Sequence, residues 1–159
     1  MPPEVASLLG ALTAAEIRPW LIGGWATELL SRRSRPHDDI DFFVAVNDVP
    51  RLAPLLSKLG FTLVHGSLVD DAVYKRGDVL LNLTPIDDTI APPRTLGSLA
   101  GIVWPADLLT GQLVEWNGLP VQTLTPTALI AMKRCVSQFY TVPLREKDDW
   151  DVRALEPLT

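Results

Sequence analysis

Residues 20–41 read WLIGGWATELLSRRSRPHDDID, and this stretch decides the fold. The short apolar run from Trp20 to Ile22 predicts a strand, and Gly23-Gly24 after it predicts a tight turn. The residues that follow predict a helix, which ends before Pro36 because proline disfavours helical backbone in the residue preceding it. A second strand begins among the acids that close the stretch. The order predicted is therefore strand, glycine turn, helix and strand.

Three carboxylates fall within four residues at the start of this second strand, those of Asp38, Asp39 and Asp41. Residues two apart on a strand face the same side, so Asp39 and Asp41 project together. Charged groups on a buried strand need a compensating partner, since removing them from water is costly. A hard cation such as Mg²⁺ binds carboxylate oxygens of this kind. The alternative interpretation is a solvated strand end, whose acids repel pairing at a sheet edge.

The glycine pair upstream, Gly23 and Gly24, lies between a predicted strand and a predicted helix. Glycine lets backbone N–H groups approach phosphate oxygens, and the start of a helix adds a favourable electrostatic field. Two glycines alone usually mark only a tight turn. Followed by a helix and then by Asp39 and Asp41, they indicate a site that holds a nucleoside triphosphate through its phosphates and a bridging metal.

The rest of the chain alternates between helical and strand patterns, which predicts an α/β fold with a mixed α+β sheet and flanking helices. Its length fits a single domain over residues 1–159, in which residues 125–159 form a C-terminal helical segment. Asn117-Gly118 predicts a hairpin, and Thr125-Pro126 predicts a helix start. Helices are predicted over about 5–16, 25–31, 48–59 and 125–139 and from 146, and strands over about 20–22, 39–46, 61–64, 72–75, 79–84, 113–116 and 119–124.

The composition narrows the classes of function. A net charge of −5 disfavours a broad nucleic-acid-binding surface, which requires a basic face. The apolar runs are far shorter than a membrane span, so neither nucleic acid nor a membrane is expected as a partner. The lone cysteine, Cys135, excludes an internal disulfide framework and a cysteine-based zinc site, and it fits a cytoplasmic protein.

Two segments, residues 20–26 and 34–41, resemble the small antibiotic nucleotidyltransferases, which are the aminoglycoside and lincosamide adenylyltransferases of the DNA polymerase β-like superfamily. The resemblance continues more thinly over residues 77–85, 129–133 and 147–151. It implies the minimal polymerase β-like fold. It also implies transfer of a nucleoside monophosphate from an NTP, with ATP as the default donor, to a hydroxyl of a small molecule. The sequence does not fix the oligomeric state, and a homodimer is the assembly considered.

The resemblance also assigns residues. Asp39 and Asp41 would bind Mg²⁺, and Gly23 with Gly24 would receive the triphosphate. At the position of the family's third carboxylate this chain has Asn82. An amide carries no charge and cannot act as a general base. Binding of metal and nucleotide is therefore expected, with catalysis dependent on what replaces the missing acid.

Three further residues are expected at the nucleotide site. Arg35 and His37 match the family's Arg-x-His-Asp-Asp pattern, although a hydrogen-bonded, positioning histidine is the simpler interpretation of His37 because Mg²⁺ prefers oxygen ligands. Lys133 follows an apolar helical run and could reach the triphosphate. The commoner alternative for such a lysine is a surface side chain that covers apolar residues.

Asn82 leaves three functions open. The first is a slow or narrowly specific Mg²⁺-dependent transferase; if turnover is instead brisk, Asp87 or Asp88, folded back by a loop, is first in line as the base. The second is a nucleotide-binding homologue that is catalytically weakened or inactive. The third is the nucleotidyltransferase-type component of a toxin–antitoxin pair.

Overall fold

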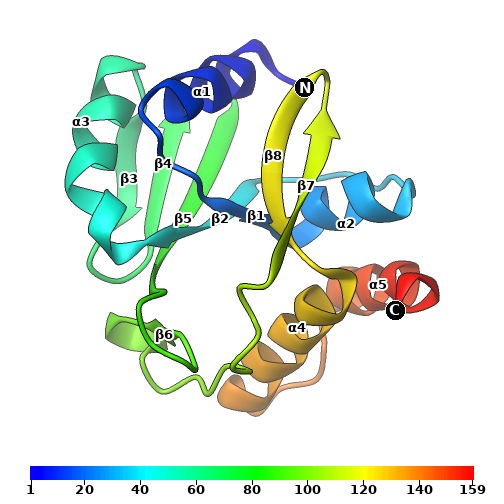
Figure 1. Cartoon of the computed structure of the whole chain (residues 1–159). Helices are drawn as coiled ribbons and strands as arrows, with labels where there is room; N and C mark the ends of the chain where they lie inside the picture. Colours follow the sequence, from blue (N-terminus) through cyan, green and yellow to red (C-terminus); the bar gives the residue numbers. More distant parts are fainter.

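The computed structural model describes all 159 residues, and it shows a mixed sheet flanked by five α-helices (Figure 1). The helices are α1 (Pro3–Ala14), α2 (Gly23–Ser31), α3 (Val49–Lys58), α4 (Pro126–Tyr140) and α5 (Glu146–Leu155). The strands are β1 (Trp20–Ile22), β2 (Ile40–Ala45), β3 (Thr62–Gly66), β4 (Ala72–Arg76), β5 (Val79–Asp87), β6 (Arg94–Thr95), β7 (Gly111–Trp116) and β8 (Leu119–Leu124). The predicted α/β class is confirmed. None of the helices has the length and apolar character that crossing a membrane requires.

The sheet order brings the key segments of the chain together. Neighbouring strands follow the order β3-β4-β5-β2-β1-β8-β7, and the short β6 pairs with the end of β5. β2 runs parallel to β5 and antiparallel to β1. At the centre, Ile22 lies opposite Asp41, and Asp41 lies opposite Asn82. Strand pairing alone therefore places the end of β1, the acids and Asn82 side by side.

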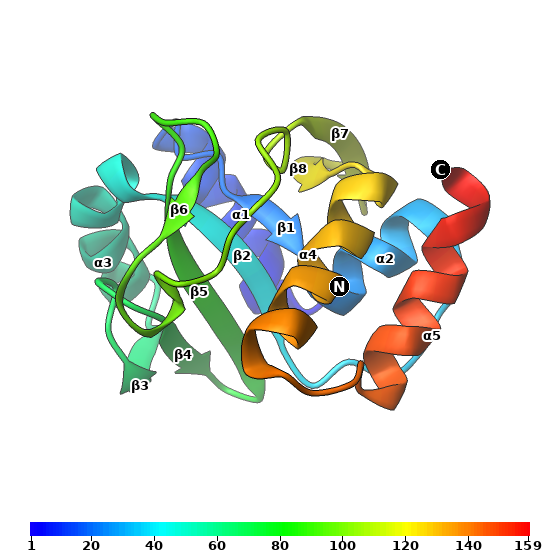
Figure 2. The ribbon, with the colours of Figure 1, turned by 90° about the horizontal axis from the view of Figure 1, so that it is seen from below.

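The two faces of the sheet have different surroundings. On one face, Leu12 of α1 and Leu56 of α3 pack with Phe42 of β2 in the hydrophobic core. Because side chains alternate along a strand, Asp41 on β2 and Asn82 on β5 point to the other face. There α2, α4 and α5 pack together, on the side of the molecule away from α3 (Figure 2). The polar face of the central strands thus lies between the sheet and the C-terminal helices.

Most elements begin and end within a few residues of the prediction, and three differences are informative. α2 begins at Gly23 itself, whose φ of +69° turns the chain sharply out of β1, so the glycines form the first helical turn. β5 extends to Asp87, because β6 pairs with its last two residues. Thr125 caps α4 at its predicted start, whereas Asp48, the acid at the predicted start of α3 that a sequence pattern favours as a cap, makes no such hydrogen bond and instead pairs with Arg51.

Candidate active site

A cleft of about 450 Å³ opens on the face of the sheet that carries the acids. The end of β1 and residues along β2 and β5 form one wall, and residues of α4, of the segment after it and of the first turn of α5 form the other. All the residues predicted for the site line this cleft, namely Gly23, Gly24, Arg35, His37, Asp39, Asp41, Asn82 and Lys133. The fold therefore brings together residues that are far apart in the sequence.

The Asn82 amide bridges the two acids. Its Nδ2 atom donates to Oδ2 of Asp39 and to Oδ1 of Asp41, each over 2.9 Å. Asp39 and Asp41 therefore project to one side, as the period of two predicted. Both carboxylates approach a single nitrogen atom. One donor lying between two anions marks a position of strongly negative potential.

Asp41 has a strongly shifted pKa. Burial, followed by the charge of Asp39, raises the pKa of Asp41 to about 6, and the hydrogen bond from Asn82 partly offsets both effects. The side chain is surrounded by protein atoms but retains some contact with solvent in the cleft. Like charges this close disfavour ionisation of both groups, so a cation between them would relieve the repulsion.

Both glycines of the turn are required by close packing at the site. A Cβ atom on Gly23 would collide with Oδ2 of Asp41. A Cβ atom on Gly24 would lie 2.5 Å from Nη2 of Arg35 and 2.5 Å from Nδ1 of His37. Only glycine lets the first turn of α2 approach these side chains so closely. The first N–H groups of a helix have no partner within that helix, so this end of the cleft suits an anion.

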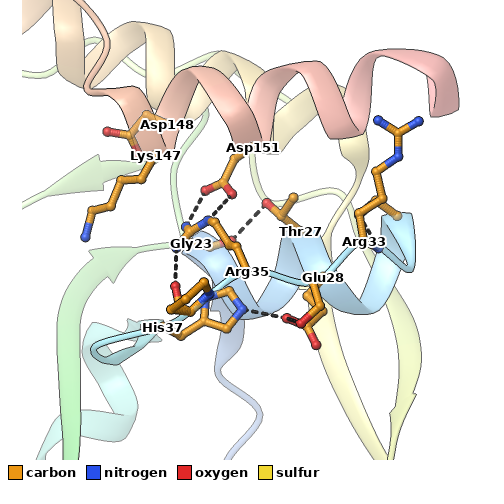
Figure 3. Close-up of polar contacts among 12 residues, drawn as sticks. Gly23, Thr27, Glu28, Arg33, Arg35, His37, Lys147, Asp148 and Asp151 are labelled. Atoms are coloured by element: carbon orange, nitrogen blue, oxygen red, sulfur yellow. Dashed lines mark hydrogen bonds and ion pairs between the residues drawn. The ribbon is translucent and has the colours of Figure 1, made fainter.

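Arg35 is held by the C-terminal helix. Its Nε and Nη2 atoms each donate to the Asp151 carboxylate over 2.8 Å, and Figure 3 shows this two-pronged contact reaching from the segment before β2 to α5. Asp151 has no solvent-exposed surface. Burial alone would raise the pKa of Asp151, but the Arg35 hydrogen bonds and the Lys133 charge hold it below its usual value. Arg35 is thus fixed at the cleft by a buried partner.

Lys133 belongs to the same charged network. Its Nζ atom lies 2.8 Å from Asp151 and 2.9 Å from Asp148, and the side chain is buried. The commoner alternative for Lys133, a side chain at the protein surface, is therefore wrong. The sequence interpretation missed Asp148 and Asp151. Their spacing of three residues on a helix, which places both side chains on one face, was the available signal.

His37 is a packed and hydrogen-bonded residue. Its Nε2 atom lies 2.7 Å from Oε2 of Glu28 (Figure 3), and its ring packs on Trp25 with a centroid separation of 4.4 Å. Trp25 in turn packs on Trp116 at 4.9 Å. These contacts fix the imidazole beside Gly24, which agrees with the positioning interpretation.

The cleft also contains an acid that the sequence interpretation missed. Asp71, just before β4, accepts a hydrogen bond of 2.9 Å from the Thr84 hydroxyl of β5 and lines the cleft. Asp87 and Asp88, which the sequence offered as replacement bases, do not line it. Asp87 instead accepts hydrogen bonds from Thr89, because β5 continues and carries Asp87 away from the site. That expectation is corrected.

The fold resembles solved nucleotidyltransferases. The chain is similar to the lincosamide antibiotic adenylyltransferase LnuA with bound lincomycin, with 17% identity, a TM-score of 0.73 and coverage of 100% of this chain and 98% of that chain. It is similar to ANT(2″)-Ia in complex with adenylyl-2″-tobramycin, with 22% identity, a TM-score of 0.70 and coverage of 98% and 87%. A putative nucleotidyltransferase from Thermotoga maritima has 12% identity, a TM-score of 0.62 and coverage of 86% and 84%. These similarities show the nucleotidyltransferase fold.

The sequence itself gives the family. No curated protein sequence matches the chain significantly. The family model described as aminoglycoside-2″-adenylyltransferase matches residues 4–87, which is more than half of the chain and includes β1, the glycine turn, both acids and Asn82. The resemblance carried by residues 20–41 is thereby confirmed, and the chain belongs to the aminoglycoside-2″-adenylyltransferase family of nucleotidyltransferases.

Proposed function

We propose that this protein transfers a nucleoside monophosphate from an NTP, with ATP as the donor, to a hydroxyl of a small aminoglycoside- or lincosamide-type acceptor in the cytoplasm. We also propose that residues 1–159 act as one unit, in which residues 125–159 supply the helical wall. The observation that carries the proposal is the juxtaposition of Asp39, Asp41 and Gly23 in one cleft. Family membership supports the reaction class.

The donor atoms fit a magnesium ion. No group of three or more His, Cys, Asp or Glu side chains converges to hold a metal. Mg²⁺ does not need such a group, since it is usually bound by one or two carboxylates together with water and substrate phosphates. Asp39 and Asp41 would hold it, and the Asn82 amide could contribute its oxygen after a half-turn of the side chain. When bound, Mg²⁺ would neutralise phosphate charge and align the reacting oxygens.

The two ends of the cleft suit different parts of the reaction. The first turn of α2 presents backbone N–H groups, and Arg35 and Lys133 lie nearby. Among the cations that line the cleft, Lys147 has the longest ion-pair contact, 3.9 Å to Asp38, and its side chain is 38% exposed. We assign the triphosphate to this end. The acceptor hydroxyl would then approach from the side of β5.

In the proposed reaction the acceptor oxygen forms a bond to the α-phosphorus, and the bond from that phosphorus to the pyrophosphate oxygen breaks. Pyrophosphate leaves with the electron pair, and the hydroxyl proton passes to solvent or to a nearby base. Asn82 cannot take this proton, because an amide nitrogen and oxygen are not basic at neutral pH. Positioning and charge neutralisation dominate such transfers, so the reaction can proceed slowly without a carboxylate here.

Mg²⁺–ATP binding tests the proposal. Isothermal calorimetry should show Mg²⁺-dependent ATP binding to the wild type and its loss in Asp41→Asn. The matched control is Asp149→Asn, which removes the same charge from a surface pair with Arg153. Pyrophosphate release with tobramycin and with lincomycin then reports transfer. Equal ATP affinity in the wild type and Asp41→Asn would reject the proposal.

A nucleotide-binding homologue without transfer is the second candidate, and Asn82 is the observation that favours it. The same two measurements separate the candidates. ATP binding without pyrophosphate release on any acceptor supports the binding protein, whereas release with either antibiotic supports the enzyme.

A further inference from the structure

We propose that Asp71 binds a positively charged amino group of the acceptor and so selects cationic acceptors. The inference rests on the proposed function, because it assigns the acceptor to the cleft. It goes further by naming the chemical group that is recognised and the residue that recognises it.

The sheet places Asp71 away from the glycine turn. β1 leads into Gly23 on one side of β2, whereas β5 and then β4 lie on the other side. Thr84 follows Asn82 by two residues on the same face of β5, about 6.6 Å further along the strand. Asp71 accepts the Thr84 hydrogen bond from the direction of β4. If phosphates occupy the end at Gly23, Asp71 faces the acceptor.

The backbone that carries Asp71 is firmly held. The preceding residue, Asp70, accepts hydrogen bonds from the backbone N–H (3.0 Å) and the hydroxyl (2.8 Å) of Ser98. The carbonyl of Asp71 accepts a hydrogen bond from Ser67, and any side chain on Gly66 would collide with that carbonyl. The loop is thus fixed on both sides of Asp71, and its carboxylate has a defined position in the cleft.

Asp71 has no positive partner within the protein. Of the cations that line the cleft, Arg35 pairs with Asp151, Lys133 and Arg145 pair with Asp148, and Lys147 lies 3.9 Å from Asp38. None of the ion pairs of the structure includes Asp71. Its only side-chain partner is the neutral Thr84 hydroxyl, which contacts one carboxylate oxygen. The other oxygen is free to accept a charge-assisted hydrogen bond from an ammonium group.

The surroundings suit an aminated ring. Tyr140 of α4 is exposed and lines the same cleft as Asp71, while Phe43 and Trp104 form the buried aromatic floor beneath it, edge to face at 5.7 Å. Aromatic faces attract cations and cover the apolar faces of sugar rings. The transferred phosphoryl group would lie near Asp41 of β2, and β5 separates β2 from the strand that follows Asp71. We therefore infer that Asp71 contacts a different substituent of the acceptor from the reacting hydroxyl.

Calorimetry with tobramycin and with its N-acetylated, uncharged derivative tests the inference. Titrations use the full chain with Mg²⁺ and a non-hydrolysable ATP analogue, and are repeated without nucleotide. Asp71→Asn keeps an oxygen for the Thr84 hydrogen bond but removes the charge. We expect it to weaken tobramycin binding about 10-fold or more and to change binding of the acetylated derivative less than about twofold. In turnover assays, the acceptor KM should rise while kcat is kept.

Two further variants serve as a charge-matched control and as a test of the Thr84 hydrogen bond. Asp78→Asn removes the same charge from an exposed turn outside the cleft and should leave tobramycin binding unchanged. Thr84→Val removes the hydroxyl that orients Asp71 and should produce a smaller loss in the same direction. The inference is overturned if Asp71→Asn binds tobramycin as tightly as the wild type does. It is also overturned if the substitution weakens binding of the charged and the acetylated compound equally, or if the wild type binds no tobramycin either with or without nucleotide. Charge-selective binding without pyrophosphate release would instead reject the proposed transfer and retain Asp71 as a cation site.

Discussion

Asn82 lies directly opposite Asp41 on the neighbouring parallel strand, and its amide nitrogen donates a hydrogen bond of 2.9 Å to the Asp41 carboxylate. The same nitrogen donates to Asp39. A neutral donor therefore partly offsets the repulsion between two acids. A carboxylate at this position would have the opposite effect, since three negative groups would then meet at one point.

Asn82→Asp should consequently lower the stability of the metal-free protein and raise its affinity for Mg²⁺. Without divalent cations, we expect a lower free energy of unfolding, because the two hydrogen bonds are replaced by repulsion. With Mg²⁺ the loss should be recovered through tighter metal binding. If the new carboxylate acts as a general base, turnover should rise about 10-fold or more. Denaturant unfolding with and without Mg²⁺, and pyrophosphate release, measure the two effects. Turnover unchanged in Asn82→Asp would mean that Asn82 is not what limits the reaction.

Asp41→Asn should stabilise the protein at neutral pH. Because the pKa of Asp41 rises to about 6 on folding, the folded state binds a proton more tightly than the unfolded chain. The charged carboxylate therefore costs stability above pH 6. The cost falls as the pH drops below 6 and is nearly gone below about pH 4, where the unfolded chain also begins to bind the proton. We expect Asp41→Asn to gain about 1–3 kcal/mol at pH 7.5 and nothing near pH 3.5.

Denaturant unfolding of the wild type and Asp41→Asn across this pH range provides the check. Asp78→Asn is the control, because that side chain is exposed in the β4–β5 turn. A constant stability difference between the wild type and Asp41→Asn at every pH would show that ionisation of Asp41 is not the cause.

Asp151→Asn should be strongly destabilising, because it leaves Arg35 and Lys133 at a buried site without their shared counterion. Breaking a buried pair in this way typically costs about 3–5 kcal/mol. Asp149→Asn, two residues earlier on α5, removes only a surface pair with Arg153 and should change stability by less than about 1 kcal/mol. Thermal unfolding compares the two variants. Similar losses in both would contradict a special position for Asp151.

Gly23→Ala should weaken Mg²⁺–ATP binding more than any other conservative change at the turn. The methyl group would collide with Asp41, and a φ of +69° costs a non-glycine residue about 1–2 kcal/mol. Gly10→Ala is the matched control, because a Cβ atom at this helical position meets no other atom within 4 Å. It should be neutral or slightly stabilising. Calorimetry with ATP, beside thermal unfolding, tests the contrast, and equal ATP affinity in both variants would show that the turn has room for a side chain.

Residues 20–46 were sufficient to predict β1, α2, β2 and the shared direction of Asp39 and Asp41, because each depends on neighbouring residues. Alternation sets the face of a strand side chain, and glycine sets the turn. The same local rules left Lys133 ambiguous. Whether a lysine on an apolar helix is buried depends on what packs against it, and its partner Asp151 comes from another helix.

Two pairs of acids, one on α5 and one beside the strand ends, show the limit of local patterns most clearly. Asp149 and Asp151 are close neighbours on one helix, yet Asp149 pairs with Arg153 at the surface and Asp151 is fully buried, because Asp151 faces Arg35 and, on α4, Lys133. Asp71 and Asp87 are both acids beside strand ends, and only the pairing of β4, β5 and β6 decides which one reaches the cleft.

The contact between Arg35 and Asp151 spans 116 residues of chain. A ribosome that adds roughly 5–20 residues per second therefore makes the glycine turn and both acids on the order of ten seconds before it makes the counterion of Arg35. During that interval the nascent chain also lacks α4 and α5, which form the far wall of the cleft. The cleft is therefore complete only after translation has passed residue 151.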